Sequence, residues 1–359
     1  MQFPPPYLPF RSLCRIKKLT LFLSPLYLAF SFFGCIPYLL HVGSEQGKIL
    51  LNRQKIDEII LEKKLDEASL RKLHLIQEVR EFAITELGLN PKGGFLYFTQ
   101  LDRDEIGWNV SASEPLSFTS YTWWFPIAGT VPYKGFFDER LAKELEAELK
   151  KDGLDTRIRT IGGYSTLGWF SDPVLSPQLK WKDYRLVGLV FHELAHATAY
   201  LPGDSDLNES YASFIEEKGM EKYFLLKEGT SSLSLAESKK DSNFRRQTIE
   251  LLKRYAQSLD SIYLSEKSKE EKLKLKIATI AEFKEEVIRL KFVPSEKIEE
   301  FRKKEWNNED FLGALRYHSG SKGFEKIFLR VNEDFSQFHR EIRKLFELSD
   351  EERKVFLEN

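Results

Sequence analysis

The sequence predicts an α+β fold that is mainly helical, with a small strand region before a central helix and a helical C-terminal part. Apolar residues recur at helical spacing in four segments, and four shorter segments are rich in the aromatic and β-branched residues typical of strands. The helical segments are residues 139–151, 184–200, 244–264 and 267–291. The strand segments are residues 95–98, 107–112, 123–131 and 156–161, all before the central helix.

The charges of the chain are nearly balanced. Its 359 residues include 54 Lys and Arg against 55 Asp and Glu, and 42% of them are hydrophobic. A chain of this length and composition can bury a large core, as one domain or as two closely packed halves. The balanced charge gives no indication of a nucleic acid as partner.

The central helix carries the most informative motif. The pentapeptide HELAH, from His192 to His196, has the HExxH spacing, although only six His occur in the whole sequence. Residues four apart lie on one face of a helix, so both imidazoles can reach one metal ion while Glu193 stands beside its open coordination position. Asp183 is a suitable N-cap for this helix over residues 184–200. The motif predicts a Zn2+ site with its own general base.

A catalytic zinc ion normally has three protein ligands, so one more residue must join the two histidines. The metzincin class needs Gly and His at the third and sixth positions after His196, where this chain has Ala199 and Pro202. Glu209 comes thirteen positions after His196, in the first turn of a second helix predicted over residues 208–219. Two helices joined by a turn, with Glu on the second, form the gluzincin arrangement.

Other polar residues near Glu209 have alternative roles. Asp204 and Asp206, in the loop before the second helix, are alternative third ligands. Glu216, two turns further along the helix, is expected to be too far from Glu209 to share its metal. The histidines also need hydrogen-bond partners for their second nitrogens, and Ser213 is placed to be one of them.

These motifs resemble a family of predicted bacterial zinc aminopeptidases, chains of about this length with a lipoprotein-type leader. The likeness covers several segments in the same order. They are VREFAITELGL at 79–89, WNV and WWFPIAGTVPYKGFF within 108–137, YSTLGWFSDPVL at 164–175, HELAH, NESYASFIEE at 208–217 and NNEDFLGALRYH at 307–318. The resemblance implies a gluzincin-type peptidase in which His192, His196 and Glu209 bind zinc and Glu193 is the base.

The predicted mechanism follows from the zinc ion. Zinc lowers the pKa of a bound water toward about 7 and polarises the scissile carbonyl. Glu193 would take the proton of that water and pass it to the leaving amine. A further group must stabilise the oxyanion, and gluzincins often use Tyr or His for this role. Tyr317, next to His318, is the first candidate, and Tyr164 is the second.

Residues 156–161, TRIRTI, alternate β-branched residues with arginines, which is typical of an edge or half-exposed strand. An edge strand can pair with the extended backbone of a peptide, as in β-augmentation. The aromatic turn at 164–170 would then line the floor of the site. The alternative is that the strand serves only as scaffold.

The N-terminus has the features of a secretion leader. Residues 1–34 contain four basic residues, no acidic residue and a long apolar run that ends at Cys35. Cys35 is the predicted site of lipid attachment in a lipobox. The alternative is an uncleaved anchor over residues 19–40, since about 22 mostly apolar residues can span a bilayer. Either route predicts a bacterial envelope protein, anchored in the membrane and facing the periplasm or the exterior.

The C-terminal part begins with a Ser-rich segment at 229–243, which predicts an exposed loop or linker. Two long charged helices then predict a helical hairpin, followed by shorter helices. These shorter helices are expected at residues 295–303, 308–317, 324–330 and 334–348. His339 falls within them and is expected to be a packing or surface histidine.

These observations combine into one predicted organisation and function. A leader at 1–34 precedes a catalytic domain with the metal site at 35–228, and the mainly helical region at 229–359 completes the same unit. The predicted activity is zinc-dependent hydrolysis of peptides, and the family resemblance implies that the enzyme is an aminopeptidase. The alternatives are a metalloendopeptidase and a non-catalytic, metal-containing envelope lipoprotein. Glu193 argues against the latter, because a structural zinc site needs no base and usually has a fourth protein ligand.

Overall fold

The structure is a computed structural model of the protein. It describes residues 38–358 except 93, 126–128, 163–171 and 316–320. The contacts of the chain divide it into two compact units, Met1–Leu51 and Asn52–Asn359. The described part of the first unit is a helix over residues 38–51. Cys35, Tyr164 and Tyr317, which the sequence singles out, lie outside the described residues.

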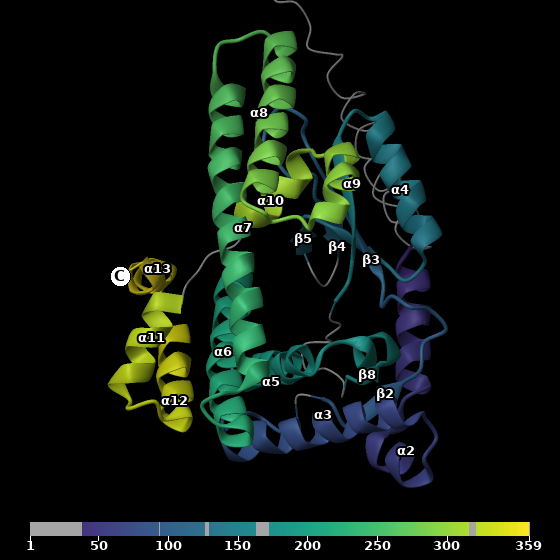
Figure 1. Cartoon of the computed structure of the whole chain (residues 1–359), viewed down its shortest axis with the longest axis vertical. Helices are drawn as coiled ribbons and strands as arrows, with labels where there is room; N and C mark the ends of the chain where they lie inside the picture. Colours follow the sequence, from purple (N-terminus) through teal and green to yellow (C-terminus); the bar gives the residue numbers. More distant parts are fainter. Residues whose placement is uncertain (1–37, 93, 126–128, 163–171, 316–320, 359) are drawn as a thin grey trace, which may run out of the picture. The chain divides into compact units, whose positions relative to one another are not determined.

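The second unit is mainly helical with a smaller share of strands (Figure 1), which confirms the predicted α+β class. Its α-helices are α2 (Ile56–Glu62), α3 (Glu67–Thr85), α4 (Glu139–Lys151), α5 (Asp183–Thr198), α6 (Ser205–Glu228), α7 (Leu233–Leu264), α8 (Lys269–Arg289), α9 (Ile298–Lys303), α10 (Asn308–Leu315), α11 (Ser321–Arg330), α12 (Phe335–Phe346) and α13 (Asp350–Glu358). Every segment that the sequence predicts as a long helix is helical, although some ends differ.

The described strands form three small sheets. In these sheets β1 (Gln54–Lys55) and β8 (Val174–Leu175) flank β2 (Tyr97–Thr99), β6 (Lys134–Phe136) and β7 (Asp155–Thr160) flank β3 (Trp108–Ser113), and β4 (Trp123–Phe125) pairs with β5 (Gly129–Val131). Helix α4 packs against β3, β6 and β7. Strand β7 pairs only with β3 among the described strands, so the edge strand predicted from TRIRTI is confirmed.

Helix α5 starts at Asp183, so the prediction of Asp183 as its N-cap is wrong by one residue. The Asp183 carboxylate instead accepts hydrogen bonds from Arg71, at 2.7 Å, and from Lys72 on helix α3. These two cations lower the pKa of Asp183 to about 2. The carboxylate therefore joins α3 to the start of α5, a contact between residues more than 100 positions apart that local capping rules do not reveal.

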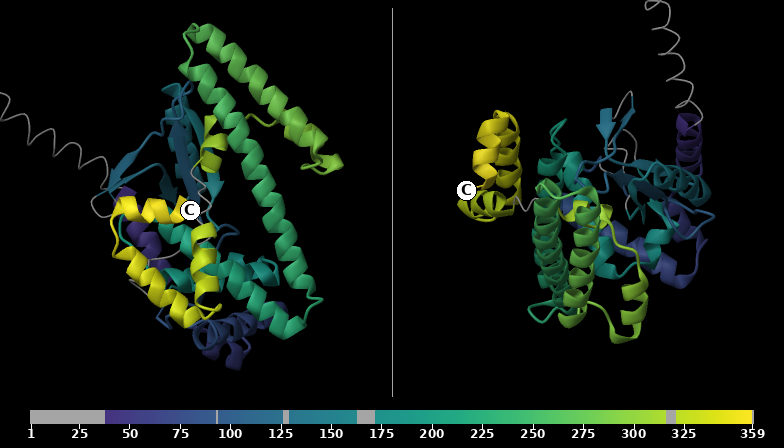
Figure 2. Two further views of the ribbon diagram at one scale, coloured as in Figure 1. Left: turned by 90° about the vertical axis from the view of Figure 1, so that its left-hand side faces the viewer. Right: turned by 90° about the horizontal axis from the view of Figure 1, so that it is seen from above.

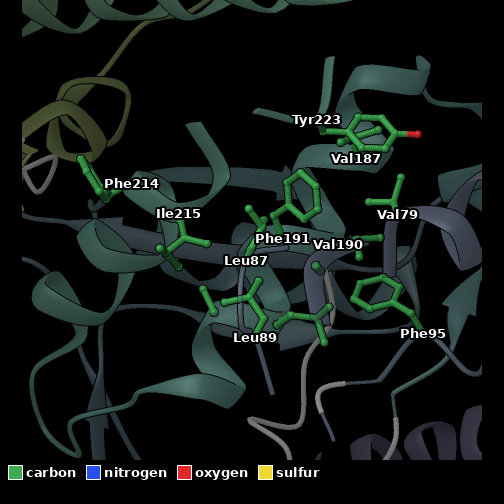
Figure 3. Packing of buried hydrophobic residues seen from close by; sticks show 14 of the residues in the cluster. Val79, Leu87, Leu89, Phe95, Val187, Val190, Phe191, Phe214, Ile215 and Tyr223 are labelled. Atoms are coloured by element: carbon green, nitrogen blue, oxygen red, sulfur yellow. The ribbon is translucent and has the colours of Figure 1, made fainter. Parts of the chain in front are cut away.

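Helix α6 runs on to Glu228, so its predicted end at Gly219 is wrong. A Cβ atom at Gly219 would lie 2.8 Å from side-chain atoms of both Leu87 and Phe191. Glycine therefore allows α6 to approach α5 and the end of α3 closely, and it does not end the helix. Leu87 and Phe191 belong to the main core, which also contains Val190 (Figure 3).

Most of the Ser-rich segment 229–243 belongs to helix α7, so the predicted exposed loop is wrong. The hydroxyl of Ser232 accepts a hydrogen bond from the backbone N–H of Leu235 at 3.0 Å and caps the helix. Farther along, the Asp241 carboxylate accepts hydrogen bonds from Tyr184 and Arg185 on α5. A helix cap and contacts to a distant helix thus order a segment whose composition is typical of loops.

Helices α7 and α8 form the predicted helical hairpin, seen in Figure 2 as two long green helices joined at one end. Between them and α10 lies a second core, with Leu259 and Tyr263 from α7, Phe283 from α8 and Phe311 from α10. Within this core the Tyr263 hydroxyl donates a hydrogen bond to Asn308 at 2.7 Å. The hairpin is therefore tied to α10 by apolar and polar contacts.

The shorter C-terminal helices follow the predicted order, but α13 is not predicted from the sequence. Its segment is short and rich in charged residues, so it has little helical periodicity to detect. His339, on α12, is buried, which agrees with its expected role in packing. Helix α11 packs against α6, the second helix of the predicted site, and also against α12 and α13.

No helix in the described part of the chain is both long and apolar enough to cross a bilayer. The predicted leader at 1–34 and lipid attachment at Cys35 fall on residues that are not described. The leader, the lipid anchor, the uncleaved alternative and the domain boundaries therefore stay predictions.

Candidate functional site

Helix α5 brings the two histidines of HELAH together on one face. The Nε2 atoms of His192 and His196 are 3.2 Å apart, and their ring centroids are 4.9 Å apart. This is the geometry expected for imidazoles one helical turn apart. Val190, Leu194 and Ala195 point into the main core and hold the helix in this orientation.

Glu209 reaches the histidines from the second turn of α6. Its carboxylate oxygens lie 3.3 Å from Nε2 of His192 and 3.5 Å from Nε2 of His196. The helix starts at Ser205, so the predicted position of Glu209 in the first turn is wrong by one turn. The Glu209 side chain is 61% exposed, whereas His196 is buried, so the carboxylate forms the outer wall of the cluster.

Asn208 closes the turn that brings Glu209 to the histidines. Its side chain accepts a hydrogen bond from the N–H of Leu201 and donates one to the carbonyl of Leu201, both at 2.8 Å. Asn208 is fully buried, so these two bonds satisfy both ends of a polar amide. The carboxylate of Asp204, an alternative third ligand, accepts a hydrogen bond from Leu207 N at 3.0 Å and caps α6.

The second ring nitrogen of His192, Nδ1, contacts the carboxylate of Glu216. The distance from His192 Nδ1 to Glu216 Oε2 is 3.1 Å, and a carboxylate can only accept, so Nδ1 carries the proton. The prediction that Ser213 is a hydrogen-bond partner of the histidines is wrong. Ser213 is exposed, whereas Glu216 faces α5. Glu216 does not belong to the group of three converging ligands, as expected. It instead orients the ring of His192, which is one of those ligands.

Gly188 explains how Glu216 can reach His192. A Cβ atom at Gly188, one turn before His192, would lie 2.7 Å from the carboxylate oxygen Oε1 of Glu216. Any side chain here would occupy the space of that carboxylate. The glycine in the middle of α5 therefore provides the room for the contact between Glu216 and His192.

The cluster attracts a positive charge. Burial lowers the pKa of His192, but hydrogen bonds to Glu209 and Glu216 outweigh burial and raise this pKa to about 10. Burial and the nearby charge on His192 lower the pKa of His196 to about 4. The hydrogen bond with His192 lowers the pKa of Glu209. The two carboxylates beside His192 thus favour a positive charge at this cluster.

The three ligand atoms fit a single divalent metal ion. They lie 3.2, 3.3 and 3.5 Å from one another. Zinc–ligand distances of about 2.0–2.2 Å place the corners of a tetrahedral site about 3.3–3.6 Å apart, close to this spacing. Two imidazoles and one carboxylate are also donors that zinc accepts in catalytic sites, with a fourth position left for water. In the described part of the chain, His192, His196 and Glu209 form the only group of this kind.

Two further side chains belong to the surroundings of the cluster. Glu193 follows His192 in α5 and is half-buried, and its charge contributes to the raised pKa of His192. Tyr200, one turn after His196, places its ring edge-on to the His196 ring, with centroids 6.4 Å apart. Tyr200 is not predicted from the sequence, although its spacing from His196 could have indicated it. The two tyrosines proposed for the oxyanion lie outside the described residues.

The chain is similar to a known protein family. A family model described as "Putative aminopeptidase" matches residues 37–357. No curated protein matches the chain, and no solved structure matches it. Because the family match extends over far more than half of the chain, the protein belongs to this aminopeptidase family.

Proposed function

We propose that the protein is a zinc-dependent peptidase that acts as an aminopeptidase. Membership of the family supports a peptidase activity in general. The observation that carries the zinc proposal is the convergence of His192, His196 and Glu209, with ligand atoms within 4.8 Å of one another. Glu193, on the same helix as the histidines, would be the general base.

When bound, zinc supplies a Lewis acid that polarises the scissile carbonyl and makes water more acidic. His192 and His196 would hold the ion through Nε2, and Glu209 would hold it through its carboxylate. Glu216 would keep the Nδ1 proton on His192, so that Nε2 stays free for the metal. Glu193 would take a proton from the attacking water and deliver it to the leaving amine.

The proposed site for the backbone of a peptide substrate is the edge of strand β7. The side chain of Asn307 donates a hydrogen bond to the carbonyl of Thr156 at 3.0 Å, so this backbone group is already paired. Alternate residues of a strand present their backbone groups to the same edge, so those of Ile158 and Thr160 face the same way as Thr156. An extended peptide substrate would pair with this edge by β-augmentation.

The experiment that tests the function compares one peptide with a free α-amine and the same peptide with an acetylated α-amine. The zinc-loaded protein is expected to remove the N-terminal residue of the free peptide and to leave the acetylated peptide intact. Protein stripped with a chelator serves as the control, and activity is expected to return with zinc. Cleavage inside both peptides would favour the metalloendopeptidase, and no cleavage of either would overturn the proposal.

Gly188→Ala tests the support of His192 by Glu216. The added methyl group is expected to push the flexible Glu216 carboxylate away from His192 Nδ1. Loss of such a partner typically lowers metal affinity by about 10- to 100-fold, while the helix itself tolerates Ala well. The zinc dissociation constant is measured by competition with a chelator of known affinity.

The matched control for this variant is Gly313→Ala on α10. A Cβ atom at Gly313 would meet nothing within 4 Å, so zinc affinity is expected to stay the same. Equal zinc affinity in Gly188→Ala and the unchanged protein would contradict the role given to Glu216.

A further inference from the structure

The C-terminal helices α11, α12 and α13 contact helix α6 on either side of Glu209. We propose that these three helices form a brace that positions Glu209 for the metal, with Tyr211, His339 and Arg353 as positioning residues. The inference rests on the proposed function, because it concerns the residue that would complete the zinc site. It assigns a role to the last 40 or so residues of the chain, which hold none of the three ligands.

The first contact of the brace is a buried hydrogen-bond chain. Tyr211 lies two residues after Glu209, and its hydroxyl is 2.9 Å from Nδ1 of His339 on α12. Nε2 of His339 is 2.8 Å from the carbonyl oxygen of Leu87. A carbonyl can only accept, so Nε2 of the neutral ring donates to Leu87 and Nδ1 accepts from the Tyr211 hydroxyl. Burial lowers the pKa of His339 to about 4, so the ring is neutral at neutral pH.

These hydrogen bonds connect α6, by way of the end of α3, to the helix that carries the histidines. Leu87 follows the end of α3, and α3 packs directly against α5. His339 therefore joins α6 and the end of α3 through one ring, and both of its nitrogens are satisfied. Tyr211 and His339 are almost completely buried, so a shift of α6 would leave polar groups without partners. The hydrogen bonds of His339 thus favour one position of α6 relative to His192 and His196.

The second contact lies at the start of α6. Nε of Arg353, a buried residue on α13, is 3.7 Å from Oδ2 of Asp204, the N-cap of α6. Arg353 also donates hydrogen bonds to the carbonyl of Leu348 and to Asp350. The guanidinium therefore links the last helix to the cap that begins the turn before Glu209.

Aromatic packing holds the brace against α6. The ring centroid of Phe214 on α6 lies 5.9 Å from Phe324, 5.6 Å from Phe328 and 5.1 Å from Phe338. Rings at these distances pack in favourable tilted or edge-on arrangements. Polar contacts at two points and an aromatic cluster between α6, α11 and α12 restrict both translation and rotation of α6. Metal ligands need such support, since a displacement of about 1 Å is enough to loosen a site.

Tyr211→Phe, made in the full chain, tests the brace. The variant removes one hydroxyl and keeps the ring, so the aromatic packing is preserved. Its zinc affinity, measured by chelator competition, is expected to fall about 10-fold, as for the loss of an outer partner of a metal ligand. The matched control is Tyr223→Phe, also on α6, where a buried hydroxyl donates to Glu78 at 2.6 Å. Both variants are expected to lower the Tm, but only Tyr211→Phe is expected to weaken zinc binding.

Arg353→Gln provides a second, independent variant, because it alters the contact at the start of α6 and leaves the buried chain intact. It is also expected to weaken zinc binding, with the far-ultraviolet circular dichroism unchanged. Equal zinc affinity in Tyr211→Phe, Arg353→Gln and the control would overturn the brace and leave the proposed function standing. A wild-type protein that binds no zinc would overturn the metal site and the brace together.

Discussion

Glu193→Gln is expected to remove most of the peptide cleavage while zinc stays bound. The amide has nearly the size of the carboxylate but cannot take a proton from the attacking water. General-base catalysis typically contributes about 10²- to 10⁴-fold, so kcat/KM is expected to fall by a factor in this range. Glu193 is outside the group of converging ligand atoms, so the variant should keep about one zinc ion per chain. Metal analysis and kinetics on the same preparation measure both quantities.

The control for this variant is Glu144→Gln, the same chemical change on the surface of α4. Glu144 is exposed and its carboxylate pairs with Arg140 at 2.7 Å, so neither zinc content nor cleavage is expected to change. Equal cleavage by Glu193→Gln and the unchanged protein would remove Glu193 from the mechanism. Loss of zinc together with cleavage would make Glu193 a ligand and not a base.

Glu209→Ala is expected to weaken zinc binding more than any change outside the ligand group. The variant removes one of three ligands and leaves two histidines, whose imidazoles alone fill half of a tetrahedral site. The loss of affinity should therefore exceed the roughly 10- to 100-fold that follows removal of an outer partner. The measurement is zinc retained after dialysis against chelators of graded affinity. Cleavage is expected to fall with the bound zinc and to recover partly at high zinc concentration.

Glu217→Ala is the matched control for the third ligand. Glu217 is an exposed acid on the same helix, two turns beyond Glu209, and it does not belong to the converging group. Its removal changes the charge of the chain equally and should leave zinc affinity unchanged. If Glu209→Ala also leaves zinc affinity unchanged, the third ligand is elsewhere, and Asp204, the N-cap of α6, or Asp206, in its first turn, becomes the next candidate.

The pair of histidines in HELAH could be predicted because helical geometry is local. A helix from 183 to 198 puts residues 192 and 196 on one face whatever surrounds it, and the structure places their Nε2 atoms 3.2 Å apart. The turn to α6 was also predictable, since the loop is short and Glu209 lies near the start of the next helix. The roles of these residues in catalysis stay predictions until the variants are measured.

The errors in the helices have a common cause. Gly219 was expected to end α6 and the Ser-rich segment 229–243 was expected to be a loop, because both are typical of chain breaks. In the structure, Gly219 lies against Leu87 and Phe191, and the start of α7 is tied to α5 through Asp241. Both outcomes depend on partners far away in the chain, which local composition does not reveal.

The sequence by itself determined the mainly helical class, the edge strand and the i, i+4 pair of histidines, because each depends on residues close together in the chain. The tertiary structure decided which side chain supports the site. Glu216 and Ser213 lie less than one turn apart on α6, and only the way in which α6 crosses α5 makes Glu216 face His192. That crossing is close because Gly188 and Gly219 have no side chains at the contact, so the choice of Glu216 arises from the packing of two helices and not from spacing along one.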